Sequence, residues 1–331
     1  MSEPPHPPYY DSAQGAWILS RHADVLAALQ HPHLWPVGGG NREILPESRD
    51  EAGRLKMRTD VLARFSQSHL VLWRPRMESE ALRILKELPA GRPVDLLRQF
   101  ALPWGLTLAL LATGADPADR EKLGALGTRV FAATGASEDS PSRADAAAAT
   151  AEMERIFEHG SVPMGEPTFV ALSQTMPRLL ASCWLALFGH PVEYAKLRAR
   201  PDLMSVAVEE LLRYSGIVRR VFRRSTARVE LGGVIIGQGD LVILMLARAN
   251  RDPARFADPD SLDVTRPVAI HFSLGHGRNS CVGANPVRMA VSIATTALVS
   301  TFASAELRGT GEWRLGSGFR FPASVDVTLF A

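Results

Sequence analysis

The sequence predicts a mostly α-helical fold with a small β portion. Helical periodicity, with apolar residues three and four positions apart, recurs through the first two thirds of the chain. Strand-forming residues bounded by glycines concentrate later, at about residues 218–246. With 46% hydrophobic and 22% charged residues, the 331-residue chain can bury a sizeable core. Length alone would allow two domains, but we expect a single domain over residues 1–331, with β-rich portions at about 14–21 and 218–246.

In chain order, the first expected elements are a strand at 17–20 and a helix at 22–29. A run of helices then follows, at 53–63, 75–88, 93–113, 117–134, 144–159, 167–188, 191–200 and 203–214. Residues 137–149 are low in complexity and are expected to begin as an exposed loop. The later strands are expected at 218–222, 229–231, 234–236 and 241–246, and a last apolar helix at 282–298.

Composition excludes several classes of protein. The formal charge of +2, from 37 basic and 35 acidic residues, gives no nucleic-acid signal. The N-terminus lacks the charged flank and apolar core of a signal peptide, and polar residues and prolines interrupt the apolar stretches at 100–115 and 169–188. Only two cysteines occur, which suits a reducing compartment, and Cys183 has the apolar neighbours of an inert core residue. We therefore expect a cytoplasmic protein without a membrane anchor.

The other cysteine, Cys281, lies in a glycine-rich segment. Gly275 and Gly277 precede it and Gly283 follows it. Because glycine has no side chain, the backbone there can adopt positive φ and pass close to a flat ligand. The helix expected from residue 282 would place the cysteine at a helix N-terminus, where free N–H groups favour the ionised thiolate. This setting favours a thiolate ligand for haem iron over a packed or bridged cysteine.

Glu210 and Arg213 are three positions apart on an expected helix and therefore face the same way. Taken alone, they would form an ordinary surface ion pair. Residues 249–266, however, form a chain of turns with little periodicity, and so long an irregular segment inside a compact domain needs anchoring charges. Arg266 can supply the third member of a buried Glu-Arg-Arg cluster.

Together these features resemble the cytochrome P-450 family of haem-thiolate enzymes. The family's cysteine loop, Phe-Gly-x-Gly-x-His/Arg-x-Cys-x-Gly, is matched by the glycines around Cys281, although Leu274 replaces the phenylalanine and Asn279 the basic residue. Glu210 and Arg213 match the family's Glu-x-x-Arg, and residues 249–259 match the turn before the haem loop. The resemblance spans nearly the whole chain. It implies a P-450-like fold in which haem lies between a long distal helix and a proximal cysteine loop.

The resemblance also implies haem b as the cofactor, with Cys281 as the axial iron ligand. The carboxylates of the haem need cationic partners, because buried charges must be paired. Arg58, Arg223 and His271 match family positions that contact these carboxylates, and Arg54 stands where the family has a histidine. Each of these bases would otherwise be a solvated surface residue.

The expected distal helix departs from the family pattern Ala-Gly-x-Asp/Glu-Thr. Residues 171–175 correspond to it. Ala171 keeps the small residue beside the cofactor, and Thr175 keeps the hydroxyl, but Leu172 replaces the glycine. Gln174, which cannot titrate, replaces the acid of the proton relay. We take Thr175 and Gln174 as the candidate catalytic residues, and Pro177 is expected to kink the helix at its centre.

Two segments, at about residues 30–53 and 135–168, are shorter than in typical relatives, and in the family they build the roof of the pocket. We therefore expect a thin or incomplete roof, with a substrate that is bulky and partly exposed or carried by another protein, or with a partner or second copy completing the site. The substrate class that we expect is a small or carrier-bound organic molecule of the secondary-metabolite type. The family's default function is a monooxygenase that uses dioxygen and electrons from a ferredoxin or flavoprotein. The alternatives are a haem-thiolate peroxygenase, dehydratase, isomerase or coupling enzyme, or a non-catalytic haem-binding or interaction protein.

Overall fold

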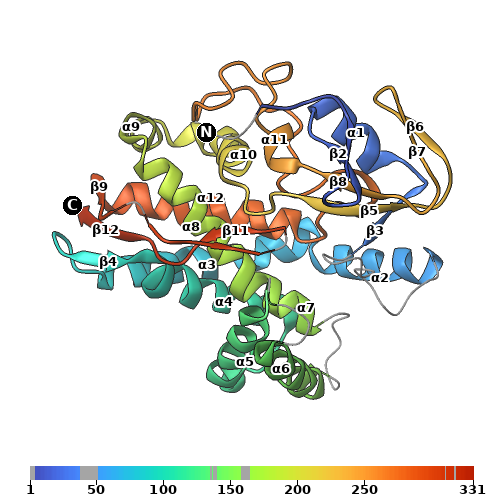
Figure 1. The fold of residues 1–331 in the computed structure, drawn as a ribbon. Coiled ribbons are helices and arrows are strands. Elements are labelled where there is room, and N and C mark those ends of the chain that lie inside the picture. Colours follow the sequence, from blue (N-terminus) through green and yellow to red (C-terminus); the bar gives the residue numbers. More distant parts are fainter. Residues whose placement is uncertain are drawn as a thin grey trace.

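The computed structural model describes residues 4–37, 51–134, 136, 140–157, 165–309, 311–316 and 318–331, with the backbone alone for residues 51–55 and 57. Helices dominate, and the strands lie in small sheets at the periphery (Figure 1). The predicted fold class, mostly α with a small β portion, is thereby confirmed.

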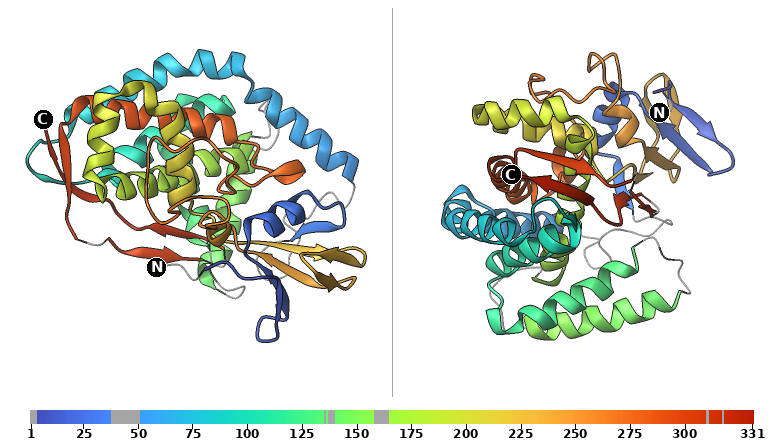
Figure 2. Two further views of the ribbon diagram at one scale, coloured as in Figure 1. Left: turned by 90° about the horizontal axis from the view of Figure 1, so that it is seen from above. Right: turned by 90° about the vertical axis from the view of Figure 1, so that its left-hand side faces the viewer.

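The described α-helices range in length from 4 residues in α11 to 21 residues in α3. They are α1 (His22–Gln30), α2 (Glu51–Arg64), α3 (Gln67–Glu87), α4 (Leu102–Thr113), α5 (Arg120–Ala132), α6 (Pro141–Phe157), α7 (Gly165–Val170), α8 (Met176–Phe188), α9 (Pro191–Ala199), α10 (Met204–Ser215), α11 (Leu246–Ala249) and α12 (Ala284–Thr301). Two π-helical turns, at Leu97–Ala101 and Ala171–Thr175, lead directly into α4 and α8. Helices α5 and α6 lie side by side at one end of the molecule (Figure 2).

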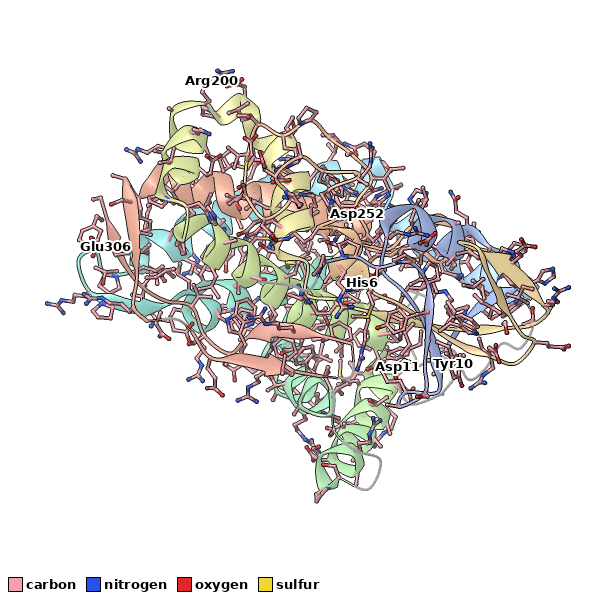
Figure 3. All side chains as sticks on the ribbon, turned by 45° about the horizontal axis from the view of Figure 1, so that its top comes forward. His6, Tyr10, Asp11, Arg200, Asp252 and Glu306 are labelled. Atoms are coloured by element: carbon pink, nitrogen blue, oxygen red, sulfur yellow. The ribbon has the colours of Figure 1, made fainter. Side chains whose placement is uncertain are left out.

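The main sheet has the strand order β1-β2-β8-β5-β3, and β2 runs parallel to β8. Its strands are β1 (Tyr9–Asp11), β2 (Ala16–Leu19), β3 (Leu34–Val37), β5 (Val221–Ser225) and β8 (Leu241–Leu244). The smaller sheets are formed by β4 (Pro93–Asp95), β12 (Asp326–Phe330) and β9 (Ser304–Leu307), by β6 (Val229–Leu231) and β7 (Val234–Ile236), and by β10 (Trp313–Leu315) and β11 (Arg320–Pro322). Tyr10 on β1 and Glu306 on β9 mark opposite ends of the molecule (Figure 3).

The core forms where α8 packs against α4, α10 and α12. Two fully buried indoles anchor it. Trp104 donates to the Met77 carbonyl at 2.9 Å, and Trp184 donates to the Thr295 hydroxyl at 3.1 Å. Because each ring buries a large apolar surface while its N–H keeps a partner, these residues fix the packing of helices from distant parts of the sequence.

Several predicted boundaries were wrong. The helix predicted over 93–113 begins instead with strand β4, because Pro93–Asp95 pairs with β12 more than two hundred positions away. Helix α3 starts at Gln67 rather than 75, and it includes Pro75 on an exposed face, where water can satisfy the carbonyl that the proline leaves without a donor. Strands β1 and β3 and the C-terminal strands, which are short and defined by tertiary pairing, were not predicted.

Candidate functional site

A largely apolar cavity of about 370 Å³ lies between the segment around Cys281 and the π-turn that precedes α8. This volume is in the range of small-molecule and cofactor sites. The lining comes from α1, α2, α7, the π-turn, α8, the segment before β5, β5 itself, α11, the cysteine loop and α12. The lining residues are Leu29, Val61, Phe65, Pro167, Thr168, Ala171, Leu172, Thr175, Met176, Leu179, Ile217, Val218, Val221, Arg223, Leu246, Ser273, Leu274, Gly275, Asn279, Cys281, Val282, Gly283 and Val287.

The cysteine loop is held in a tight conformation by its glycines. Gly275 and Gly277 both have φ of 69°, in the left-handed region that favours glycine. A Cβ at Gly277 would lie 3.2 Å from the Leu29 carbonyl oxygen, so the loop packs closely against the end of α1. The Cys281 N–H donates to the Leu274 carbonyl at 2.8 Å. As a result, the Cys281 side chain is exposed on the wall of the cavity.

The pKa of Cys281 is raised, whereas the sequence analysis expected a setting that lowers it. Protein atoms surround the thiol although it is exposed to the cavity, and this burial raises its pKa, while the Gly283 N–H, Arg58 and Arg288 lower it by a smaller amount. Helix α12 begins at Ala284, later than predicted, so its N-terminus does not outweigh burial. A bound metal ion would favour the thiolate here, because a metal ion deprotonates a coordinating thiol.

Two of the bases predicted to contact the haem carboxylates, Arg223 and Arg58, lie at the cavity or against the cysteine loop. Arg223, on β5, lines the cavity and is buried. Arg58, on α2, donates from its Nη2 to the Ser280 carbonyl at 2.8 Å, directly before the cysteine. Arg223 therefore lies in the wall of an otherwise apolar cavity, and Arg58 contacts the cysteine loop that borders it. The side chain of Arg54 is outside the described residues.

His271 is not brought to the cavity. Its Nε2 lies 3.1 Å from Glu209 Oε2, and Arg288 binds the same carboxylate at 2.6 Å and 3.1 Å. Burial raises the pKa of Glu209, but the hydrogen bonds from His271 and Arg288 and the charge of Arg288 more than offset this and lower it to about 2. The triad links α10 to α12 behind the cysteine loop. The sequence analysis did not predict the roles of Glu209 and Arg288. A second acid directly before Glu210 was the one sequence feature that pointed to Glu209.

The Glu210, Arg213 and Arg266 side chains do come together. Arg213 binds Glu210 through two hydrogen bonds of 2.7 and 2.8 Å, and Arg266 Nε donates to the same carboxylate at 3.0 Å. Glu210 and Arg213 are only 3% exposed, so this is a buried charged cluster rather than a surface pair. Arg213 also donates to the carbonyls of Asn250, Pro259 and Ser261 and thereby holds the irregular segment in place.

The distal wall is formed by the π-turn Ala171–Thr175. The Met176 N–H donates to the Ala171 carbonyl, a spacing of five residues, and Pro177 follows at once without an N–H of its own. The irregularity that we expected as a kink at Pro177 is therefore present as this π-turn, and α8 begins directly after it. Ala171, Leu172 and Thr175 line the cavity.

Gln174 lies on the other side of this turn and does not line the cavity. Its Nε2 donates to Thr128 Oγ1 on α5 at 3.5 Å, and its Oε1 accepts from Arg178 Nη1 at 3.1 Å. Arg178 also donates to the Gln174 carbonyl at 2.7 Å and stacks on Phe131, with 4.0 Å between Cζ and the ring centroid. The π-turn rotates this side chain away from the position assigned to it from sequence.

Comparison with known proteins agrees with this arrangement. The family model described as Cytochrome P450 matches residues 188–317. The cytochrome P450 monooxygenase PikC of Streptomyces venezuelae is 30% identical, with 76% of this chain and 67% of PikC covered. The chain belongs to the cytochrome P450 family. The vitamin D(3) 25-hydroxylase of Pseudonocardia autotrophica is also 30% identical, over 82% of this chain and 77% of that protein. The crystal structure of P450BioI in complex with an acyl carrier protein ligated to hexadec-9Z-enoic acid superimposes with a TM-score of 0.86 at 23% identity, covering 98% of this chain and 95% of that one.

Cytochromes P450 are haem-thiolate monooxygenases, and this chain is accordingly a haem-dependent oxidoreductase. The cavity fits a haem group. It is largely apolar, it exposes one thiol, and it has Arg223 in its wall and Arg58 bound to the adjoining cysteine loop. Gly283 leaves space beside the sulfur, since a Cβ there would lie 3.7 Å from Cys281 Sγ. Within the described ranges, no group of three or more His, Cys, Asp or Glu residues could hold a separate metal ion. Nor is any helix in that part of the chain long and apolar enough to cross a membrane.

Proposed function

We propose that this P450 is a monooxygenase that binds haem b in the apolar cavity through Cys281. The observation that carries the assignment is the single thiol, exposed in an apolar wall and held there by a loop of positive-φ glycines. When bound, the haem supplies the redox chemistry with dioxygen, and electron donation from the thiolate favours O–O cleavage. Arg223, in the cavity wall, and Arg58, bound to the cysteine loop, are the cations that would pair with the haem carboxylates.

The remaining lining residues bind the substrate and control access of protons. Leu172, Met176, Leu179 and Ile217 present apolar surface that excludes water and favours an apolar part of the substrate. Thr175 is the distal hydroxyl of the π-turn that lines the cavity, and we assign proton transfer at its Oγ1, with water as the further donor. Gln174 is assigned a positioning role, because its amide binds Thr128 and Arg178.

The substrate class and partners follow the same proposal. We infer a small or carrier-bound organic substrate, since relatives include PikC and the structurally similar P450BioI is crystallised with a ligated acyl carrier protein. Electrons would come from a ferredoxin or a flavoprotein in the cytoplasm. A partner protein or second copy would complete the roof at the segments near residues 30–53 and 135–168.

A second candidate is haem-thiolate chemistry that does not activate dioxygen. It is favoured by the position of Gln174, because residue 174 neither titrates nor lines the cavity and so supplies no acid to a distal proton relay. A peroxide-driven reaction, a dehydration or an isomerisation has less need of that relay.

One experiment separates these functions. Turnover of a substrate, first found by its shift of the Soret band, is measured with ferredoxin and reductase, with peroxide, and with neither. The monooxygenase requires the reduced donor and dioxygen and incorporates one oxygen atom from ¹⁸O₂ into the product. Equal product formation without donor and dioxygen eliminates the monooxygenase and supports the second candidate.

A further inference from the structure

A second cavity, of about 590 Å³, lies on the far side of the chain segment that borders the haem cavity. Its lining comes from α8, the end of α10, strands β9–β11, and the loops that carry Arg219, Arg251 and Asp260. Residues 214–223 are the partition. Ile217, Val218 and Val221 face the haem cavity, whereas Tyr214, Ser215 and Arg219 line the second one. The P450 reaction as proposed above does not use this space.

Three arginines converge on the second cavity: Arg219, Arg251 and Arg320. The acid in the lining, Asp260, is already bound to Arg251, with 2.6 Å between Oδ1 and Nη1. Arg251 in addition donates to the Tyr214 carbonyl at 3.1 Å. The cavity therefore carries an excess of positive charge that its own lining does not neutralise.

Arg219 is the clearest sign of a missing anion. Its guanidinium is half-buried, and among the described residues it has no hydrogen-bond or ion-pair partner. Burial, together with the charges of Arg320 and Arg251, lowers its pKa to about 10. Burying a cation beside like charges is unfavourable unless a counter-ion binds.

The other lining groups suit an organic anion. Arg320 stacks on the Trp313 ring, with 4.2 Å between Cζ and the centroid, which leaves its N–H groups free of acid partners in the described part of the chain. Leu185, Ala186 and Leu307 give an apolar side to the same cavity. The buried hydroxyl of Ser215 has no hydrogen-bond partner among the described residues.

We propose that this cavity is a binding site for a small organic anion, whose carboxylate or phosphate oxygens pair with Arg219 and Arg320 and whose apolar body lies against Leu185 and Leu307. The planar guanidinium fork matches both kinds of oxyanion. The volume suits a molecule of the size of a metabolite. The site is separate from the haem cavity and stands whether or not the monooxygenase assignment holds.

The test measures binding of benzoate and phenyl phosphate to the haem-loaded protein by calorimetry, with benzamide as the uncharged analogue. Benzoate or phenyl phosphate is expected to bind in a saturable manner and benzamide much more weakly. Charge-assisted hydrogen bonds predict that Arg219→Gln weakens anion binding about tenfold or more. The matched control is Arg200→Gln, because Arg200 is exposed, bound to Asp202 and outside the cavity (Figure 3), and it should bind as the wild type does.

Two further measurements locate the ligand. Anion binding should change tryptophan fluorescence, and Trp313→Phe should remove most of that change. Anion binding should persist when imidazole saturates the haem iron, as followed by the Soret band, whereas competitive displacement of the anion by imidazole would place the anion beside the haem and contradict the proposal. Equal binding of benzamide, no effect of Arg219→Gln, or no saturable binding of either anion also overturns it. If Arg219→Gln does not fold, Arg320→Gln tests the same loss of anion affinity at the second proposed partner of the anion.

Discussion

The two sides of the haem cavity are held by different forces. The cysteine side rests on paired charges, which are buried in the Glu210 cluster and partly buried in the triad of Glu209, His271 and Arg288. The distal side is a π-turn packed among apolar residues, and the buried Gln174 side chain in this turn points away from the cavity. Charge networks tolerate few changes, because removing one member leaves another buried and unpaired. Apolar walls tolerate substitution more readily. The comparison indicates that the cysteine side fixes the cofactor and the distal side adapts the chemistry.

The largest effect is expected from Cys281→Ser. The reduced carbon monoxide complex of the wild type should show the red-shifted Soret band of thiolate ligation, and the variant should lose it together with all turnover. Cys183→Ser is the matched control, because Cys183 is fully buried beside the Leu211 carbonyl and burial raises its pKa to about 12. Loss of the band in the control but not in Cys281→Ser would contradict the assignment.

Glu210→Ala is expected to destabilise the protein by about 3–5 kcal/mol, since Arg213 and Arg266 would remain charged and unpaired. Chemical denaturation of the haem-loaded protein measures the change. Glu230→Ala, at an exposed carboxylate on β6, should alter the free energy of unfolding by less than about 0.5 kcal/mol. Equal stability of the two variants would show that the cluster is not structural.

On the distal side, Thr175→Ala should lower product formed per reductant consumed by a factor of about 10² if Thr175 transfers protons. Gln174→Glu should not improve this ratio, because a carboxylate at residue 174 would meet Arg178 rather than the cavity. The ratio of product to consumed reductant is measured for both variants. A large gain with Gln174→Glu would mean that residue 174 does reach the reacting oxygen.

The smallest expected effect is a pH dependence of the cysteine side. Burial raises the pKa of Glu209, but His271 and Arg288 more than offset this, and the pKa is about 2 against an ordinary value of 4.5. A carboxyl whose pKa is lower in the folded protein stabilises it above the unfolded pKa, and this stabilisation is lost as pH falls towards the folded pKa. Stability should therefore decline between about pH 4.5 and 2. Glu209→Gln should reduce this slope in thermal unfolding, and an unchanged slope would assign the decline to other groups.

The sequence was most informative where a local pattern sets the structure. The glycines at 275 and 277 predicted a loop with positive φ, and the spacing of Glu210 and Arg213 predicted a pair on one helix face. It was least informative where tertiary packing decides. Whether residue 174 faces the cavity depends on a π-turn, and whether His271 reaches a ligand depends on Glu209 from another helix. The second cavity is lined by residues from two helices, three strands and the loops between them, and no local sequence pattern predicts it.

The partition at residues 214–223 also has a thermodynamic consequence. Neighbouring residues of this segment line two cavities. A shift of its backbone that improves the fit of a ligand in one cavity would therefore also move the side chains that line the other. Coupling of this kind is reciprocal. By whatever factor an anion changes the affinity of the haem cavity for its substrate, the substrate changes the affinity for the anion by the same factor. A single titration of one ligand at several fixed concentrations of the other measures that factor from either direction.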